Sequence, residues 1–168
     1  MTQQPYRVLF LCTGNSARSI LAEALLGTLG KGRFEAYSAG SMPSGAVQPL
    51  AAEIAVSLGY PPEKLRSKNW DEYAVADAPQ MDMIITVCDN AAGEVCPIWP
   101  GHPATAHWGV PDPAAVVGTE DVRRRAFREA YVTLRRRVEL LAALPLDKLD
   151  RLAAQTHIRA IGGETVQE

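Results

Sequence analysis

An apolar run, a loop that begins with a cysteine, and a helical pattern follow one another directly near the N-terminus. Residues 8–11 (VLFL) are apolar and closely bounded, which predicts a buried strand. Apolar side chains recur at helical spacing over residues 20–26 and predict a helix, for which Ser16 or Ser19 is available as the N-cap. Residues 12–18 (CTGNSAR) are therefore expected to form a loop between the carboxyl end of a strand and the start of a helix.

This loop has the residue types of an oxyanion site. Its successive backbone N–H groups can point into one concavity, and a helix N-terminus favours an anion there. Arg18 adds a planar two-pronged donor, and the same positive field predicts a lowered pKa for Cys12, whose thiolate Ser19 could stabilise by a hydrogen bond. The alternative is that Cys12 is a small buried hydrophobic residue and Arg18 a surface residue. The predicted substrate-binding residues are Thr13, Gly14, Asn15, Ser16, Ala17, Arg18 and Ser19.

Length and composition limit the other classes of function. A chain of 168 residues predicts a single domain over residues 1–168, because single domains commonly reach ~100–200 residues. The net charge of −2 gives no reason to expect nucleic acid or a membrane surface as a partner. No apolar run approaches the ~18 residues that span a bilayer, and the polar start lacks a signal-peptide pattern, so we expect a cytoplasmic protein.

The three cysteines are too few and too odd in number for a secreted disulfide framework. A zinc site is poorly supported, because Cys88 and Cys96 are eight residues apart and there is no CxxC pair or paired histidine motif. In a reducing compartment, such thiols are either reactive or buried. Redox chemistry and a structural role in the core therefore stay open for these two cysteines.

Strand and helix patterns alternate along the rest of the chain. The predicted strands cover residues 34–39, 83–87 and 106–108, and the predicted helices cover residues 50–58, 71–73, 120–143 and 146–161. This alternation predicts an α/β domain of three layers, with a mainly parallel central sheet flanked by helices. Seven arginines between Arg123 and Arg137 fit a solvated helix face better than a nucleic-acid-binding patch.

Chemistry-bearing residues follow three of the predicted strands. Cys12 and Cys88 each end a strand, and Asp112 comes a few residues after a third. Because the carboxyl ends of parallel strands meet at one edge, where ligands bind, we expect these side chains to lie close together. Asp112 also precedes a proline, and the alternative is that it only shapes a turn.

These motifs together resemble a known family. Residues 12–19 (CTGNSARS) and an Asp-Pro pair much later in the chain resemble the low-molecular-weight protein tyrosine phosphatases. Cys88, Cys96 and residues 107–114 (HWGVPDPA) resemble more closely the arsenate reductases built on that phosphatase fold. The resemblance covers residues 6–143 and so implies the phosphatase-like fold for most of the chain.

The resemblance implies a thiol cascade that reduces arsenate to arsenite. Cys12 would attack arsenate held by the loop amides and Arg18, with Asp112 as the general acid. Cys88 would then attack the sulfur of the adduct, releasing arsenite and leaving a Cys12–Cys88 disulfide. Cys96 would resolve that bond to give Cys88–Cys96, which an external dithiol protein of the thioredoxin or glutaredoxin type would reduce.

The cascade carries one structural expectation. A Cys88–Cys96 disulfide needs Cα atoms within ~7 Å, so we predict that residues 88–97 rearrange on oxidation.

Residues 144–168 lie beyond the resemblance and are expected to form a C-terminal helical extension.

The family also implies a monovalent cation site beneath the loop, often occupied by potassium, and no other tightly bound cofactor. Asn15, Glu23, Ser38 and Asp71 fall at matching places. The alternatives are that Asn15 only makes hydrogen bonds within the loop and that Glu23 and Asp71 are solvated.

Two departures from the family bear on the choice of function. Ala17 stands where many relatives have a second loop cysteine, which argues against a disulfide within the loop. Ala114 and Ala115 stand where the phosphatases usually place aromatic residues. We therefore expect an arsenate reductase with arsenate or phosphate as its oxyanion. The alternatives are a low-molecular-weight phosphatase that hydrolyses phosphate monoesters through a phosphocysteine, and a non-catalytic oxyanion or phosphopeptide-binding module.

Overall fold

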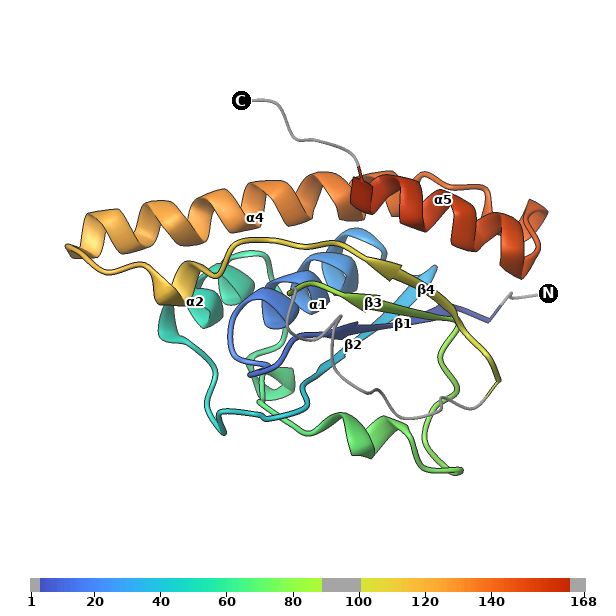
Figure 1. Ribbon diagram of the computed structural model, residues 1–168, viewed down its shortest axis with the longest axis horizontal. Helices are drawn as coiled ribbons and strands as arrows, with labels where there is room; N and C mark the ends of the chain where they lie inside the picture. The colour runs from blue at the N-terminus through green and yellow to red at the C-terminus, as the bar shows by residue number, and fades with distance from the viewer. Residues whose placement is uncertain (1–3, 89–100, 164–168) are drawn as a thin grey trace.

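Four parallel strands form the centre of the molecule in a computed structural model that describes residues 4–88 and 101–163 (Figure 1). They lie in the order β2-β1-β3-β4, and all three neighbouring pairs are parallel. The strands are β1 (Tyr6–Leu11), β2 (Phe34–Ala39), β3 (Met83–Thr86) and β4 (Ala104–His107). From β1 the chain continues to β2 on one side of β1, and from β2 it crosses to β3 on the other side of β1. The direction in which strands are added to the sheet therefore reverses between β1 and β3. Ligands bind at the carboxyl ends of strands at such a point.

Helices cover one face of this sheet, and a shorter segment covers the other. Helix α1 packs on β1 and β2, α5 packs on β4, and both α2 and α4 pack on α1 (Figure 1). On the opposite face, Trp70 of the short 3-10 helix η2 lies in a cluster with Leu9 and Leu11. The α-helices are α1 (Arg18–Leu29), α2 (Pro49–Ser57), α4 (Glu120–Ala142) and α5 (Arg151–Gly163), and the 3-10 helices are η1 (Pro62–Lys64), η2 (Trp70–Tyr73), η3 (Pro113–Ala115) and η4 (Leu146–Lys148).

The predicted three-layer α/β architecture is confirmed, and most predicted elements occur close to their expected bounds. The single helix predicted over residues 146–161 is wrong, because the chain forms the short η4 and then begins α5 at Arg151. The predicted cap of the first helix is wrong. Ala17 stands at the N-cap of α1, and no side chain caps this end. The reason is that the loop runs straight into the helix at Arg18, which leaves Ser19 inside the first turn. The uncapped end keeps its free N–H groups available for a ligand.

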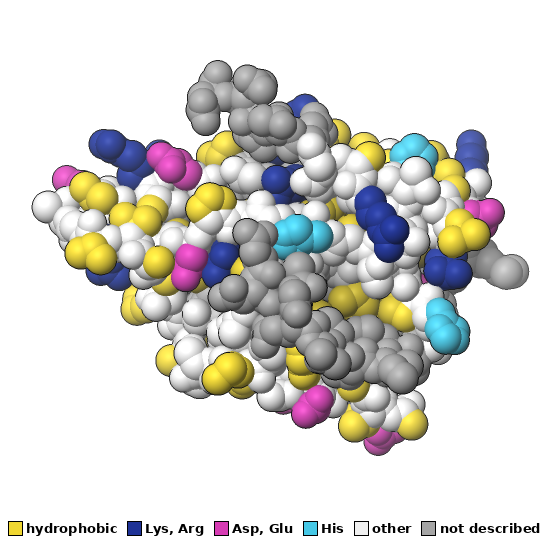
Figure 2. Space-filling view, viewed as in Figure 1, with side chains coloured by type: hydrophobic (Ala, Val, Ile, Leu, Met, Phe, Trp, Pro, Cys, Tyr) yellow, Lys and Arg dark blue, Asp and Glu magenta, His cyan; other side chains and the backbone are white. Residues whose placement is uncertain are grey.

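Helix α4 presents an apolar stripe to the core, as its sequence predicts. Phe127, Leu134 and Leu141 are buried on this stripe. Most of its arginines are exposed or partly exposed, but Arg137 is buried and donates a hydrogen bond from Nη1 to the Gly109 carbonyl at 3.0 Å. On the face seen in Figure 2, Lys and Arg side chains stand among acidic, hydrophobic and uncharged ones. The described residues of this face therefore form no continuous basic surface.

Helix α5 belongs to the C-terminal extension and packs along the edge strand β4. The Thr105 N–H donates to Gln155 Oε1 at 3.0 Å, and Arg159 Nε donates to the Thr105 carbonyl at 2.9 Å. The indole N–H of Trp108 donates to the Ile158 carbonyl at 2.9 Å. Side chains of α5 thus satisfy backbone groups that an open edge would offer to another chain. None of the helices among the described residues combines the length and the apolar character needed to cross a membrane.

Candidate active site

The loop that connects β1 to α1 lies at the carboxyl edge of the sheet. Cys12 is buried at its start, and the Cys12 N–H donates to the Ala39 carbonyl at 3.2 Å. Gly40, which follows β2, packs directly on the loop backbone. A Cβ atom at position 40 would lie 2.4 Å from the carbonyl oxygens of both Cys12 and Thr13, so any side chain there would displace the loop.

Several carbonyl groups of this loop point away from its interior and accept hydrogen bonds from the segments around it. The bonds run from Met42 N–H to Thr13 O at 2.9 Å, from Ser44 N–H to Gly14 O at 3.0 Å, from Ser67 Oγ to Gly14 O at 3.1 Å and from Gln48 N–H to Ser16 O at 2.9 Å. With these carbonyls held outside, N–H groups of the loop can face its interior. Together with the uncapped start of α1, they form a concavity that favours an anion.

Arg18 begins α1 and reaches towards the segment that contains Asp112. Its Nη1 donates to the Val110 carbonyl at 2.9 Å, and its Nη2 lies 3.6 Å from Asp112 Oδ2. The Nε of Arg18 is buried and has no hydrogen-bond partner among the described residues. Because an unpaired buried donor is costly, this N–H marks a place where an oxyanion oxygen would complete the site.

Asp112 shapes a turn and also faces Arg18; its role as a general acid stays a prediction. Its Oδ1 accepts a hydrogen bond from the Ala114 N–H at 3.0 Å, which caps η3 and shapes the turn. Its Oδ2 faces Arg18, and the Asp112 side chain is 40% exposed, so it has access to protons from solvent. This position beside the arginine suits a general acid for a group that leaves a bound oxyanion.

Cys88 follows β3 and lies beside Cys12. The Thr13 N–H donates to Cys88 Sγ at 3.3 Å, and the Cys88 side chain is hydrogen-bonded to that of Cys12. Both cysteines are buried, and they are not joined to each other by a disulfide. The parallel sheet therefore brings together two cysteines that lie far apart in the sequence, as their strand-end positions predict.

The predicted lowering of the Cys12 pKa is wrong for this arrangement. The hydrogen bond with the Cys88 side chain, and then burial, raise the pKa of the Cys12 thiol, because both favour its neutral form. The charge of Arg18 and the Gly14 N–H act in the opposite direction but do not outweigh them. Hydrogen bonding, burial and negative charge on Cys88 thus oppose formation of the Cys12 thiolate while Cys88 lies beside it.

The structure does not test two further predictions, the role of Cys96 and the hydrogen bond from Ser19 to Cys12. Cys96 lies outside the described residues, and so does most of the segment 88–97 that is predicted to rearrange; both stay predictions. Ser19 is buried and accepts a hydrogen bond from Asn15 Nδ2 at 2.8 Å. Its expected donation to Cys12 stays a prediction too.

Three of the four residues predicted to bind potassium come together beneath the loop. Asn15, Glu23 and Ser38 are buried, and Ser38 Oγ donates to Glu23 Oε1 at 2.5 Å. Asp71 lies instead on the exposed surface of η2. The predicted set is therefore not assembled as a whole, and Glu23 is not the solvated residue that the alternative expected. Across residues 4–88 and 101–163, no group of three or more His, Cys, Asp or Glu side chains could hold a metal ion.

Lys68 lies among these three residues, although no pattern in the sequence pointed to it. Burial lowers its pKa, while the nearby Glu23 carboxylate acts to raise it. Burial likewise raises the pKa of Glu23, against the effects of Lys68, Ser38 and Tyr60. A lone lysine in a polar loop is typical of a solvated side chain, so only its distant partners explain why it is inside.

The site lies at the carboxyl edge of a parallel sheet and combines a cysteine, a loop with an arginine suited to an oxyanion, and an aspartate. This combination is typical of a cysteine-dependent, phosphatase-like class of protein. The sequence pattern of the low molecular weight phosphotyrosine protein phosphatases matches residues 7–155. The chain belongs to this family.

Within this family, the chain is similar to proteins named arsenate reductase. It is 33% identical over 135 residues to the arsenate reductase of Halalkalibacterium halodurans, an alignment that covers 80% of this chain and 94% of that protein. It is 34% identical over 121 residues to the arsenate reductase of Bacillus subtilis, covering 72% and 84%.

Solved structures agree with this placement. An arsenate reductase in the phosphate-binding state superposes with a TM-score of 0.62 and 28% identity, over 82% of this chain and 97% of that chain. The thioredoxin-dependent arsenate reductase of Corynebacterium glutamicum gives a TM-score of 0.55 and 25% identity, over 83% of this chain and 65% of that chain. A tyrosine phosphatase of Erwinia amylovora shares the fold, with a TM-score of 0.59 and 20% identity, over 81% of this chain and 90% of that chain.

Proposed function

We propose that this protein is an arsenate reductase that converts arsenate to arsenite through Cys12, Cys88 and Cys96 and is regenerated by thioredoxin. The observation that carries the proposal is that Cys88 lies against the oxyanion loop, where its Sγ accepts a hydrogen bond from the N–H of Thr13, the residue after Cys12. Hydrolysis of a phosphate ester needs a single thiol. Reduction of arsenate needs two electrons, which a pair of thiols supplies when it becomes a disulfide.

The first step is attack by the Cys12 thiolate on arsenate bound in the loop. Cys12 first loses its proton to solvent; a sulfur–arsenic bond then forms, and an As–OH hydroxyl group leaves as water when Asp112 gives it a proton. Arg18 and the loop N–H groups hold the remaining oxygens, and the buried Nε of Arg18 gains the acceptor that it lacks among the described residues. Negative charge that develops on the oxyanion is thus met by donors already in place.

The second step transfers the electrons. The Cys88 thiolate attacks Cys12 Sγ, a sulfur–sulfur bond forms, and the electron pair of the sulfur–arsenic bond passes to arsenic. Arsenic goes from the pentavalent to the trivalent state and leaves as arsenite. Cys96 then attacks Cys88, Cys12 returns as a free thiol, and thioredoxin reduces the resulting Cys88–Cys96 disulfide. This cycle requires thiols that are kept reduced, so we place it in the cytoplasm.

A low-molecular-weight phosphatase activity is the second candidate function. Cys12, Arg18 and Asp112 are assembled at one site, and these residue types suffice to hydrolyse a phosphate monoester through a phosphocysteine. Ala114 and Ala115 follow Asp112-Pro113 and offer no ring to pack against a phosphotyrosine. We expect this activity to be weak in a reductase.

The test is arsenate-dependent NADPH consumption with purified thioredoxin and thioredoxin reductase. We expect sustained turnover by the wild type, and none by Cys12→Ser or Cys88→Ser. Cys96→Ser should release a single arsenite per chain and stop at the Cys12–Cys88 disulfide, which mass spectrometry detects. If thioredoxin does not support the wild type, glutathione and glutaredoxin are the second reductant to use.

Hydrolysis of an aryl phosphate by the same variants is the matched control. Cys88→Ser and Cys96→Ser should keep whatever hydrolysis the wild type shows, since that reaction needs only Cys12. Wild-type protein that hydrolyses the ester but reduces no arsenate with either reductant would instead support the phosphatase. Full function in Cys12→Ser would support a non-catalytic binding module.

A further inference from the structure

The ammonium group of Lys68 lies beneath the oxyanion loop, surrounded by oxygen atoms. Its Nζ donates to the Arg66 carbonyl at 2.8 Å, to Ser38 Oγ at 3.3 Å and to Asn15 Oδ1 at 3.4 Å. An ammonium group has three donors, and these three acceptors account for all of them. Only 5% of the Lys68 side chain is exposed, so solvent has little part in this arrangement.

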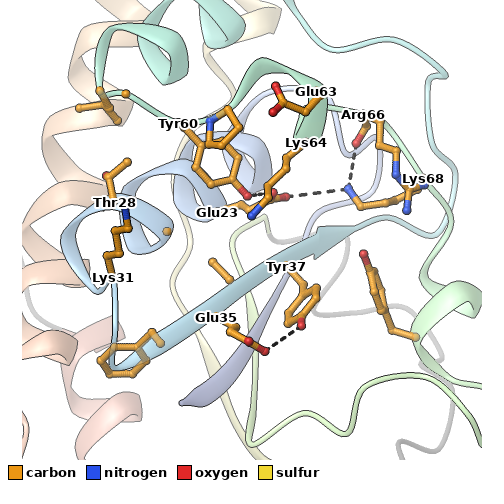
Figure 3. A pocket seen from close by; sticks show the side chains of 17 residues that line it. Glu23, Thr28, Lys31, Glu35, Tyr37, Tyr60, Glu63, Lys64, Arg66 and Lys68 are labelled. Carbon is orange, nitrogen blue, oxygen red and sulfur yellow. Dashed lines mark hydrogen bonds and ion pairs between the residues drawn. The ribbon is translucent and has the colours of Figure 1, made fainter. Parts of the chain in front are cut away.

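The charge of this ammonium group is balanced by Glu23. Its Oε1 lies 3.9 Å from Lys68 Nζ, and the Glu23 side chain is also 5% exposed. Glu23 additionally accepts hydrogen bonds from Ser38 and from the hydroxyl of Tyr60, as Figure 3 shows in part. Buried charges persist in a protein when they are paired and hydrogen-bonded in this way.

The cluster is joined directly to the oxyanion loop through Asn15. The Lys68 backbone N–H donates to Asn15 Oδ1 at 2.9 Å, the same oxygen that the ammonium group contacts. Asn15 has a φ of 44°, in the left-handed region, which asparagine adopts more readily than most residues with side chains. Lys68 therefore helps to hold this loop residue in the conformation that shapes the concavity.

Three of the residues around Lys68 are those that the family resemblance assigns to a potassium site. Carbonyl, hydroxyl and carboxylate oxygens are the groups that would coordinate such an ion. In this chain they already surround a fixed positive charge, and a second cation among the same oxygens would be repelled by it. The residues present therefore do not fit a resident potassium ion.

We infer that Lys68 is a built-in monovalent cation: its ammonium group takes the position of a metal ion among the oxygens of Asn15, Ser38, Glu23 and Arg66. It holds the oxyanion loop in its binding conformation without potassium. This inference concerns the loop itself and goes beyond the proposed reaction, because it holds whether the loop serves reduction or hydrolysis.

A cavity next to the cluster makes the inference about Lys68 testable, because it gives small cations access to the position of the ammonium group. Its volume is about 790 Å³, and Glu23, Tyr60 and Lys68 are among its lining residues (Figure 3). Lys64 lines the same cavity but is exposed, with its Nζ 6.0 Å from the centre of the Tyr60 ring. Shortening Lys68 would leave an anionic oxygen cage that small cations can reach, whereas shortening Lys64 would not.

The experiment compares melting temperatures in potassium chloride and in tetramethylammonium chloride at equal ionic strength. We expect the wild type and the control Lys64→Ala to melt at the same temperature in both salts. Lys68→Ala should melt lower than the wild type in the organic cation and regain at least about 3 °C in potassium, because an ion bound only to the folded state stabilises it. Its affinity for inorganic phosphate, measured by calorimetry, should rise with potassium in parallel.

A second variant guards against a failure of Lys68→Ala to fold. Lys68→Asn is neutral and shorter than lysine, and its side-chain oxygen can contribute to the cage. Potassium-specific stabilisation of either variant supports the inference. A potassium-specific shift in the wild type, or the absence of one in both variants, including the case in which neither folds in either salt, would overturn it. Melting and phosphate binding involve no arsenic chemistry, so this result is independent of the reductase assays.

Discussion

The two sides of the oxyanion loop differ in how their polar groups are satisfied. On the substrate side, the Nε of Arg18 is buried without a partner among the described residues, and the start of α1 is uncapped. Beneath the loop, each donor of the Lys68 ammonium group has an acceptor, and a carboxylate balances its charge. Unsatisfied donors mark the place where a ligand comes and goes, whereas a satisfied cluster is part of the permanent scaffold.

This difference predicts the largest loss of stability on the scaffold side. Glu23→Gln removes the charge that balances Lys68 and should destabilise the fold by about 3–5 kcal/mol, the usual cost of leaving one charge of a buried pair uncompensated. The matched control is Glu35→Gln in the exposed Arg7–Glu35 pair, whose side chains are 36% and 44% exposed. That change should cost about 0–1 kcal/mol.

Urea denaturation of the two variants measures this difference. Equal destabilisation by the two substitutions would contradict the view that the Glu23–Lys68 pair is a buried structural element. Glu23→Gln should also release the Asn15 conformation and so weaken binding of phosphate, while Glu35→Gln should not.

The substrate side should show the opposite pattern, a loss of activity with little loss of stability. Arg18→Lys keeps a positive charge but loses the planar fork, and we expect kcat/KM for arsenate to fall by about 10²–10³. Its melting temperature should change little, because the guanidinium already carries an unpaired buried N–H. Arg124→Lys, at an exposed arginine of α4 that pairs with Glu53, is the control and should leave both quantities unchanged. A fall in stability that matches the fall in activity would show that Arg18 belongs to the scaffold.

The smallest predicted effect concerns the pKa of Cys12. Cys88→Ala removes the largest cause of its elevation, so the Cys12 pKa should move downward, leaving burial opposed by Arg18 and the Gly14 N–H. More thiolate is then present at a given pH, and the pH dependence of alkylation by iodoacetamide shifts to lower pH.

Both proteins in this comparison also carry Cys96→Ala. Mass spectrometry then measures alkylation of Cys12 in a protein whose only other cysteine is Cys88, and in the Cys88→Ala protein, where Cys12 is the single cysteine. An unchanged or upward-shifted profile in the Cys88→Ala protein would mean that the contact with Cys88 does not control the Cys12 proton. In that case, burial alone would account for the raised pKa.

Sequence periodicity predicted most of the fold because strands and helices depend on neighbours close in the chain. Residues 34–39 were expected as a strand and form β2 with the same bounds, and the helix expected over residues 120–143 is α4. The same reasoning placed Cys12 and Cys88 at one edge, since parallel strands end together. It failed at the first turn of α1, where the loop geometry rather than a serine side chain determines how the helix begins.

Local patterns along the chain were sufficient to predict the α/β architecture, the loop at residues 12–18 and the edge of the sheet where this loop lies. The pKa direction of Cys12 and the burial of Lys68 became visible only once the chain was folded. Both depend on charges and hydrogen-bond partners that distant segments bring within a few ångströms, and on how much water those segments exclude. No pattern of near neighbours in the chain contains that information. A cysteine before a helix therefore did not predict a raised pKa, and a lysine in a polar loop did not predict a cation inside the protein.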